Sequence, residues 1–187
     1  MSEEVVEVAP PEQQVRKKRR SKRKSIGVSK SSLKKLSIEA GVDRLSSKMD
    51  VPSTIATEFL LYLIRKCLDD AARATTIAGK KTINSQILFA TCPYINTTPV
   101  HFISEKGNSS TKGHSFKIAR TIFMRTAHRA VQFNRMSENA KIALQHYCEE
   151  TLVKVLRCAN MIAKNSNRKT LKAKDLALII EFYDILV

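Results

Sequence analysis

Clusters of lysine and arginine are the residues of this sequence best suited to chemistry, and that chemistry is electrostatic. The stretch NRKTLKAKDLALII, residues 167–180, places a basic turn directly before an apolar run, and GKKTINSQILFA, residues 79–90, repeats the same Lys-Thr-apolar order. The 187-residue chain has 33 Lys and Arg against 17 Asp and Glu, a formal net charge of +16. Because so many like charges repel one another in a compact fold, such a surplus usually indicates that the protein binds a polyanion. Nucleic acid is the first candidate, and an anionic membrane surface is the second.

The histidines and cysteines show none of the spacings typical of metal ligands, and the chain has no Gly-rich phosphate loop. These residues are His101, His114, His128, His146, Cys67, Cys92, Cys148 and Cys158. We expect the cysteines to be reduced core residues in a reducing compartment, rather than disulfides or metal ligands. The sequence therefore predicts that the protein is not an enzyme and holds no cofactor and no metal.

The first 25 residues predict a disordered tail. Residues 1–15 carry four glutamates and two prolines, and eight of the nine residues 16–24 are basic. This basic run consists of Arg16, Lys17, Lys18, Arg19, Arg20, Lys22, Arg23 and Lys24 around one serine. We interpret it as a DNA-binding arm; the alternative is a nuclear-targeting signal alone, and the two roles are compatible. The N-terminus lacks the apolar segment of a secretory signal. The sequence contains no run of about eighteen apolar residues, so we expect no membrane span.

Apolar residues recur at spacings of three and four, which predicts helices. The first three are expected from Ser31 or Ser32 to Gly41, from Pro52 to Gly79 and over residues 84–91. After a linker at 92–115, three more are expected over residues 116–130, from Ser137 to the NSNRKT loop, and over residues 171–183. The order short, long, short thus occurs twice. Each long helix is apolar over more than one face, so each unit needs a second unit crossing it.

Several motifs resemble the histone family. In the first half, GVSKSSLKKL, GVDRLS and GKKT resemble histone H4; in the second half, NRMSENAKIALQ and NRKTLKAKDLAL resemble histone H3. Fused histones in this order resemble those of giant DNA viruses. The resemblance implies an all-α protein in which two histone folds, residues 26–91 and 116–187, are fused in tandem as an intramolecular handshake pseudo-dimer, behind a disordered basic tail.

The resemblance also implies where DNA would bind. In a handshake pair the first loop of one fold lies beside the second loop of the other, which places Arg44 near residues 168–170. It likewise places Arg135 near residues 80–82. Both arginines are expected to enter a narrow minor groove, where arginine is favoured. Outside the tail, the residues expected to bind DNA are Lys30, Lys34, Lys35, Arg44, Lys80, Lys81, Thr82, Lys117, Arg120, Arg135, Arg168, Lys169 and Thr170.

Each of these assignments has a plainer alternative. Arg44 is alternatively a solvated loop charge, and Thr82 and Thr170 are alternatively caps of the helices that follow. Arg168 matches the family's arginine that clamps an aspartate seven positions later, here Asp175. The first half has lysine and isoleucine at those two positions, so the clamp is absent there.

The N-termini of the two long helices, near Ser53 and Ser137, are expected to add unpaired amides facing phosphate.

Two surfaces are expected to mediate assembly, by the same resemblance. Self-association through the second histone fold would use Cys158, Ile162, Asn165, Asp175 and Leu178; alternatively, these residues only complete the intramolecular core. A second doublet resembling the other two core histones would meet Asp70, Ala74 and Ala90. The expected function is sequence-independent wrapping of double-stranded DNA in the nucleus or a viral replication compartment, with packaging in the virion. The alternative is a histone-fold regulator or scaffold that heterodimerises without wrapping DNA.

Overall fold

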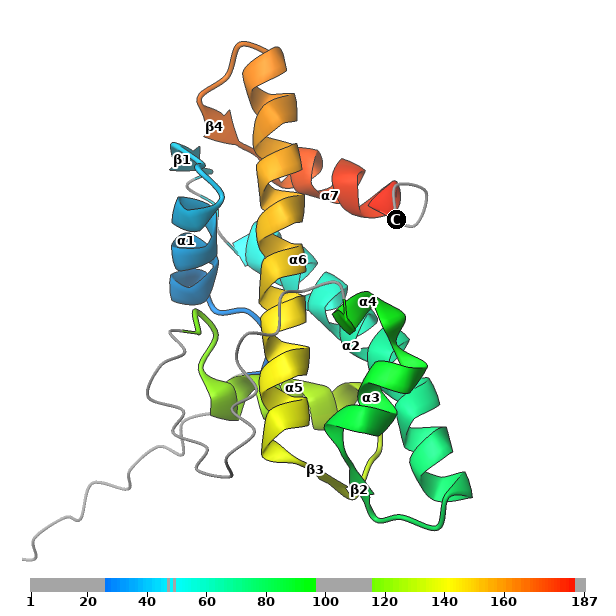
Figure 1. The fold of residues 1–187 in the computed structure, drawn as a ribbon. Helices are drawn as coiled ribbons and strands as arrows, with labels where there is room; N and C mark the ends of the chain where they lie inside the picture. Colours follow the sequence, from blue (N-terminus) through cyan, green and yellow to red (C-terminus); the bar gives the residue numbers. More distant parts are fainter. Residues whose placement is uncertain (1–25, 47, 49, 97–115, 184–187) are drawn as a thin grey trace, which may run out of the picture.

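Two long helices with shorter helices around them make up the computed structural model, which describes residues 26–46, 48, 50–96 and 116–183 (Figure 1). The first half contains α1 (Lys30–Glu39), β1 (Arg44–Leu45), α2 (Asp50–Ile77), β2 (Thr82–Ile83), α3 (Ser85–Thr91) and α4 (Pro93–Asn96). The second half contains α5 (Arg120–Ala130), β3 (Arg135–Met136), α6 (Glu138–Asn165), β4 (Thr170–Leu171) and α7 (Ala173–Glu181). The described chain is therefore mostly helical, as predicted.

The long helices α2 and α6 cross and share one apolar core (Figure 1). Its fully buried side chains include Leu60, Leu63 and Leu68 of α2 and Leu144 of α6. Burial of such a side chain contributes roughly 1.5–3 kcal/mol, so this core dominates the stability of the fold. The short helices pack across the two halves: α1 contacts α6, while α5 and α7 contact α2. Neither half therefore closes its core alone, in agreement with the expectation from the apolar faces.

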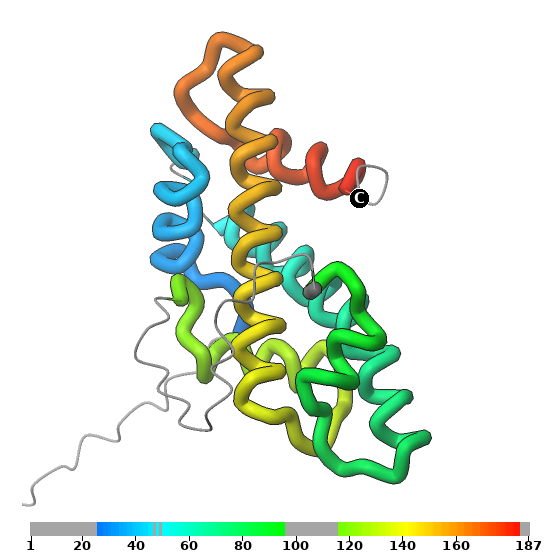
Figure 2. The backbone as a smooth tube through the Cα atoms, in the orientation of Figure 1, coloured from blue at the N-terminus to red at the C-terminus, as the bar shows by residue number. Residues whose placement is uncertain are grey.

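Two pairs of short parallel strands join the halves. β1 pairs with β4, aligning Arg44 with Thr170, and β2 pairs with β3, aligning Thr82 with Arg135. Each pairing continues for one more hydrogen bond, from Ser46 N to Leu171 O at 3.0 Å and from Ser137 N to Ile83 O at 2.9 Å. The two pairs lie at opposite ends of α6 (Figure 2). The predicted proximity of each first loop to the other half's second loop is confirmed.

Several helix boundaries differ from the prediction. Ser29, rather than Ser31 or Ser32, caps α1, because its hydroxyl accepts the backbone N–H of Ser32 at 3.1 Å. The long helix α2 begins at Asp50, before the expected Pro52. The last helix begins at Ala173 because residues 170–171 are taken up by the strand pair.

The predicted linker is also shorter than expected at its first end. Residues 93–96 form α4, and Cys92 and Ile95 are buried in the core. At its other end the expected helix over residues 116–130 begins only at Arg120. The predicted tail, its basic run and residues 97–115 of the linker lie outside the described residues. Within the described part of the chain, no helix is long and apolar enough to cross a membrane.

Candidate nucleic-acid interface

At one end of α6, the β1–β4 pair brings together the basic residues of two loops. Arg44 and Lys169 are exposed on adjacent strands or turns, and Thr170 is half-buried. The segments that precede the two strands each have a distinct local feature. Asn167 adopts a φ of 53°, a left-handed conformation that asparagine tolerates. Asn160 of α6 donates its side-chain N–H to Gly41 O at 2.8 Å, which anchors the segment before β1.

The clamp predicted in this loop is present. Arg168 donates from Nη1 to Asp175 Oδ2 at 2.9 Å and from Nη2 to Asp175 Oδ1 at 2.8 Å, a bidentate ion pair. The backbone N–H of Lys172 also donates to Asp175 Oδ2, at 2.9 Å. These hydrogen bonds, with that from Arg168 the strongest, lower the pKa of the Asp175 carboxyl. Arg168 therefore positions the loop, while Arg44 and Lys169 present charge to solvent.

At the opposite end, the β2–β3 pair carries a second basic group without a clamp. Lys80, Lys81 and Arg135 are exposed, and Thr82 is half-buried. Ile87 occupies the position of the missing aspartate and is partly buried against the core. The alternative that the two loop threonines cap helices is wrong: Asn84 caps α3, and Lys172 occupies the cap position of α7.

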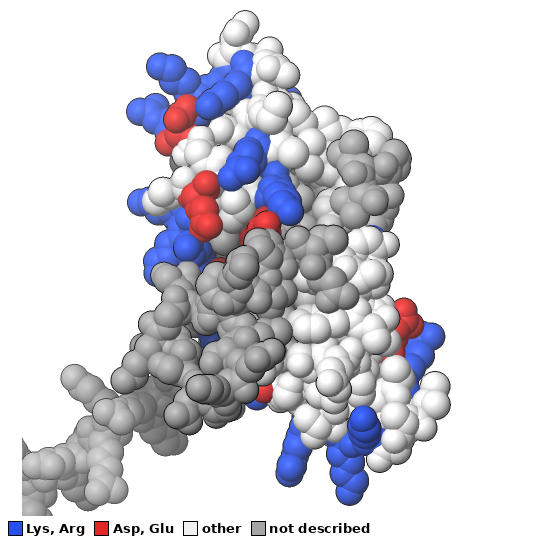
Figure 3. Space-filling view, in the orientation of Figure 1, with Lys and Arg blue, Asp and Glu red and all other residues white. Residues whose placement is uncertain are grey.

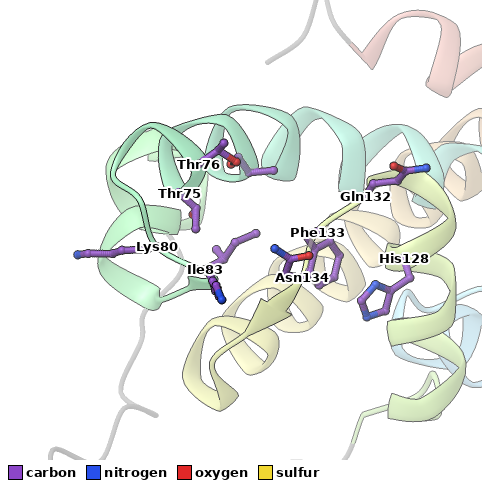
Figure 4. Close-up of a pocket in the computed structure, with 10 residues that line it drawn as sticks. Thr75, Thr76, Lys80, Ile83, His128, Gln132, Phe133 and Asn134 are labelled. Carbon is purple, nitrogen blue, oxygen red and sulfur yellow. The ribbon is translucent and has the colours of Figure 1, made fainter.

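A cavity of about 380 Å³ opens beside the β2–β3 pair, between the C-terminal ends of α2 and α5 (Figure 4). Its lining includes Lys81, Gln132 and Asn134, together with the rings of His128 and Phe133. These two rings stack with centroids 4.1 Å apart and planes 17° apart. The labelled Lys80 extends away from the other lining residues (Figure 4). The cavity thus offers amide and imidazole groups next to a basic surface.

Three residues predicted to bind DNA are engaged in ion pairs within the protein. Lys30 pairs with Asp50 at 2.6 Å, and Lys117 pairs with Glu39 at 3.1 Å. Arg120 pairs with Glu138. A phosphate would therefore compete with a carboxylate at these positions.

Other expected cations are more accessible, and some were not predicted. Lys34 and Lys35 are exposed on α1, as a DNA contact requires. Two exposed arginines of α5, Arg125 and Arg129, were not predicted. Their spacing of four residues, opposite the buried Phe123, is the pattern that could have identified them. In the space-filling view, lysine and arginine side chains gather toward the β1–β4 end and again at the β2 end (Figure 3).

At the start of α6, where unpaired amides were expected, the backbone N–H of Ser137 donates to Ile83 O at 2.9 Å. Ser137 caps α6, its hydroxyl accepting the backbone N–H of Ala140 at 3.4 Å. Ser53 lies inside the first turn of α2, and its hydroxyl donates to Val28 O, which holds the segment before α1. Their hydroxyl groups are thus already engaged within the fold.

The expected self-association surface is largely exposed. Cys158 and Asn165 of α6 are exposed, Ile162 is half-buried, and Leu178 of α7 is 42 % exposed. The alternative that these residues only complete the intramolecular core is therefore wrong for the exposed ones. Asp175 departs from the expectation: it is 3 % exposed because it lies beneath the Arg168 guanidinium.

An exposed apolar side chain beside the self-association surface was not predicted. The surface expected to meet a second doublet is also accessible. Met161 is 59 % exposed on α6, one helical turn from Cys158, a spacing that could have pointed to it. On the other surface, Asp70 and Ala90 are exposed and Ala74 is half-buried.

Comparisons with known proteins agree with this geometry. The family model of the core histone domain, which spans all four core histone types, matches residues 103–182. Among solved structures, the crystal structure of the histone from Methanopyrus kandleri matches with a TM-score of 0.54 and 20 % sequence identity, covering 80 % of this chain and 90 % of that chain. A search of curated proteins found no match. The chain therefore contains a histone-fold domain, and its structure is similar to that of an archaeal histone.

Proposed function

We propose that this chain binds double-stranded DNA without base specificity and wraps it as a histone doublet. The observation that carries the proposal is the repeated arrangement at the two ends of α6. At each end a parallel strand pair sets an exposed arginine, Arg44 or Arg135, against a threonine of the other half. Lysines flank both pairs: Lys169 at one end, and Lys80 with Lys81 at the other.

Groups of this kind bind phosphate rather than bases. Lysine and arginine side chains neutralise the backbone of any duplex, and arginine is favoured where the minor groove is narrow. Histone octamers use such arginine insertions and backbone contacts without reading bases. The net charge of +16 fits a polyanionic partner of any sequence. Two arginine-bearing ends on one rigid core would hold a duplex at two separate points and bend it between them.

The doublet part of the proposal has support from the order of elements and from coverage. Both halves have the order short helix, strand, long helix, strand, short helix. The archaeal histone match covers 80 % of this chain, an extent that neither half alone could provide. We propose that the first half acts as an H4-like fold and the second as an H3-like fold, compacting genomic DNA, of viral origin by the resemblance of the motifs. The corresponding sites would be the nucleus or a viral replication compartment, and the virion.

Assembly into a larger particle is part of the same proposal. A second copy of this chain would dock on the second-half surface formed by Cys158, Met161, Ile162, Asn165 and Leu178. A second doublet, resembling the remaining two core histones, would meet the first-half surface at Asp70, Ala74 and Ala90. Both surfaces contain exposed residues outside the two arginine-bearing ends, so DNA and protein partners could bind together.

Nuclease protection tests the wrapping function. The full chain is incubated with long duplex DNA of mixed sequence and digested with micrococcal nuclease, alone and with a complementary histone pair. Wrapping predicts protected fragments of discrete length that do not depend on DNA sequence. A chain that binds DNA yet yields no protected fragment in either arm would instead be a histone-fold regulator or scaffold, and the wrapping proposal would fail.

A further inference from the structure

Two buried thiols from separate parts of the first half lie in direct contact. Cys67 is in the middle of α2, and Cys92 follows α3 directly before α4. Their Sγ atoms are 3.2 Å apart, and the residues are 1 % and 2 % exposed. Both cysteines are free. An ordinary disulfide needs the two sulfur atoms about 1.2 Å closer than this, a movement on the scale of side-chain rotation.

The surroundings make the two thiols unequal. A hydrogen bond with Cys67 lowers the pKa of Cys92 against the opposing effect of burial, and the backbone N–H groups of Ile95 and Tyr94 and the Lys66 ammonium also lower it. The same contact with Cys92, followed by burial, raises the pKa of Cys67. Cys92 is therefore the better nucleophile and Cys67 the better resolving thiol, since the thiolate is the reactive form.

A third buried cysteine lies in the same core and supplies an internal comparison. Cys148 of α6 is fully buried, and this burial raises the pKa of its thiol. No contact comparable to the 3.2 Å one brings its sulfur against either partner among the hydrogen bonds of the described residues. Packing alone thus predicts three inert core thiols, whereas the close contact singles out one pair.

We propose that Cys67 and Cys92 form an oxidisable dithiol, closed by peroxide into an intramolecular disulfide that fastens the α3–α4 junction to α2. The Cys92 thiolate attacks one peroxide oxygen, giving a sulfenic acid and releasing hydroxide, which takes a proton to become water. The Cys67 sulfur then attacks the Cys92 sulfur, and the sulfenic hydroxyl leaves with the Cys67 proton as a second water. In total, two thiols and one hydrogen peroxide give one disulfide and two waters.

The bridge would act where the chain leaves the first half. Cys92 immediately precedes α4, whose Tyr94 ring lies 5.2 Å from the Lys66 ammonium of α2. Closing a loop between residues 25 positions apart removes conformational freedom from the unfolded chain. For a protein of this size, the resulting gain corresponds to a rise in Tm of roughly 5–10 °C. Because both sulfurs are buried, the oxidant reaches them through local opening of the short α3–α4 segment.

Peroxide oxidation of the native full-length chain tests the proposal. After reaction, remaining thiols are alkylated in denaturant, and peptide mass mapping without reductant assigns the pairs. We expect a Cys67–Cys92 disulfide that dithiothreitol reverses, together with the rise in Tm. The Cys148→Ser variant is the matched control and should form the same bridge, whereas Cys92→Ser should not. Two results on the natural chain would overturn the proposal: oxidation confined to the exposed Cys158, or a disulfide between Cys67 and Cys148. Both can be obtained even if a variant fails to fold.

Discussion

Replacing Glu149 with alanine should loosen the segment that leads into α5. Glu149 lies on α6 and is 8 % exposed. Its Oε2 accepts the backbone N–H of Lys117 at 2.8 Å, and its Oε1 accepts that of Ile118 at 3.1 Å. Gln145 completes the network, because its amide N–H donates both to Glu149 Oε1 at 2.9 Å and to Ile118 O at 2.8 Å. One carboxylate thus holds two successive backbone groups of a non-helical segment.

The expected loss can be worked out from these contacts. Alanine removes the acceptor from two backbone N–H groups, and that of Ile118 is buried. An unsatisfied buried donor costs about 1–3 kcal/mol, and the half-buried Lys117 N–H recovers part of its loss from water. Burial raises the pKa of Glu149 despite its hydrogen bonds, which means that the folded chain loses free energy by desolvating the charged carboxylate. Alanine removes this desolvation cost and so offsets part of the loss. The balance is a decrease of about 2–4 kcal/mol in the free energy of unfolding.

Urea unfolding followed by circular dichroism measures this decrease. The matched control is Glu150→Ala on the same helix, where the half-buried carboxylate pairs with Lys154 at 3.3 Å and lies 3.8 Å from His146 Nδ1. Ion pairs with a solvent-exposed partner such as Lys154 contribute only about 0–1 kcal/mol, so the control should change little. If Glu149→Ala cost less than about 1 kcal/mol, or no more than the control, the idea that this carboxylate secures the entry to α5 would be refuted.

Three further predictions concern pH, backbone strain and the clamp. Because the pKa of Glu149 is raised in the folded state, the folded chain binds a proton at a higher pH than the unfolded chain does. The free energy of unfolding of the natural chain, relative to that of Glu149→Ala, should therefore rise as pH falls from 7 toward the pKa of glutamate in the unfolded chain. Urea unfolding at several pH values measures this difference. Gly27→Ala places a Cβ on Thr57 at a φ of +84°, and thermal unfolding should show a loss of about 1–3 kcal/mol. Asp175→Asn removes the charged partner of Arg168 and should cost about 1–3 kcal/mol at neutral pH. Because the pKa of Asp175 is lowered in the fold, this difference should disappear as pH falls through that value, as a pH series of unfolding curves would show.

The pairing of the loops could be predicted from the sequence because the motifs resemble histones, and that resemblance implies a handshake between the two repeats. Once the order short, long, short is seen twice, a handshake sets Arg44 beside residues 168–170 and Arg135 beside residues 80–82, and the structure has both contacts. The Arg168–Asp175 clamp was predictable from the same resemblance, because the arginine and the aspartate stand seven positions apart as they do in the family. Both features were predictable because short motifs at the paired positions carry the resemblance, although the paired loops themselves lie far apart in the sequence.

The features that escaped prediction depend on contacts between distant segments. The apolar pattern continues back to Phe116, yet the helix begins at Arg120, and the segment before it is instead held to α6 by hydrogen bonds from the backbone N–H groups of Lys117 and Ile118 to the Glu149 carboxylate. Lys117 was expected to bind DNA, but its ammonium forms an ion pair with Glu39 of α1. The contact between Cys67 and Cys92 likewise has no sequence signature, since their spacing matches no thiol motif.

The dependence of DNA affinity on salt tests whether the two arginine-bearing ends bind DNA phosphates. Binding of the full chain to a fluorescent duplex is measured over a range of potassium chloride concentrations, and compared with an Arg44→Ala, Arg135→Ala double variant. The control is Arg157→Ala, an exposed arginine of α6 outside both strand pairs. If both arginines neutralise phosphates, log affinity falls linearly with log salt for the natural chain. The slope of the double variant should be shallower by about 0.9 for each phosphate that it no longer neutralises, and the slope of the control should be nearly unchanged. A flat response of the natural chain, or equal slopes for the natural chain and the double variant, would contradict phosphate binding at these two ends.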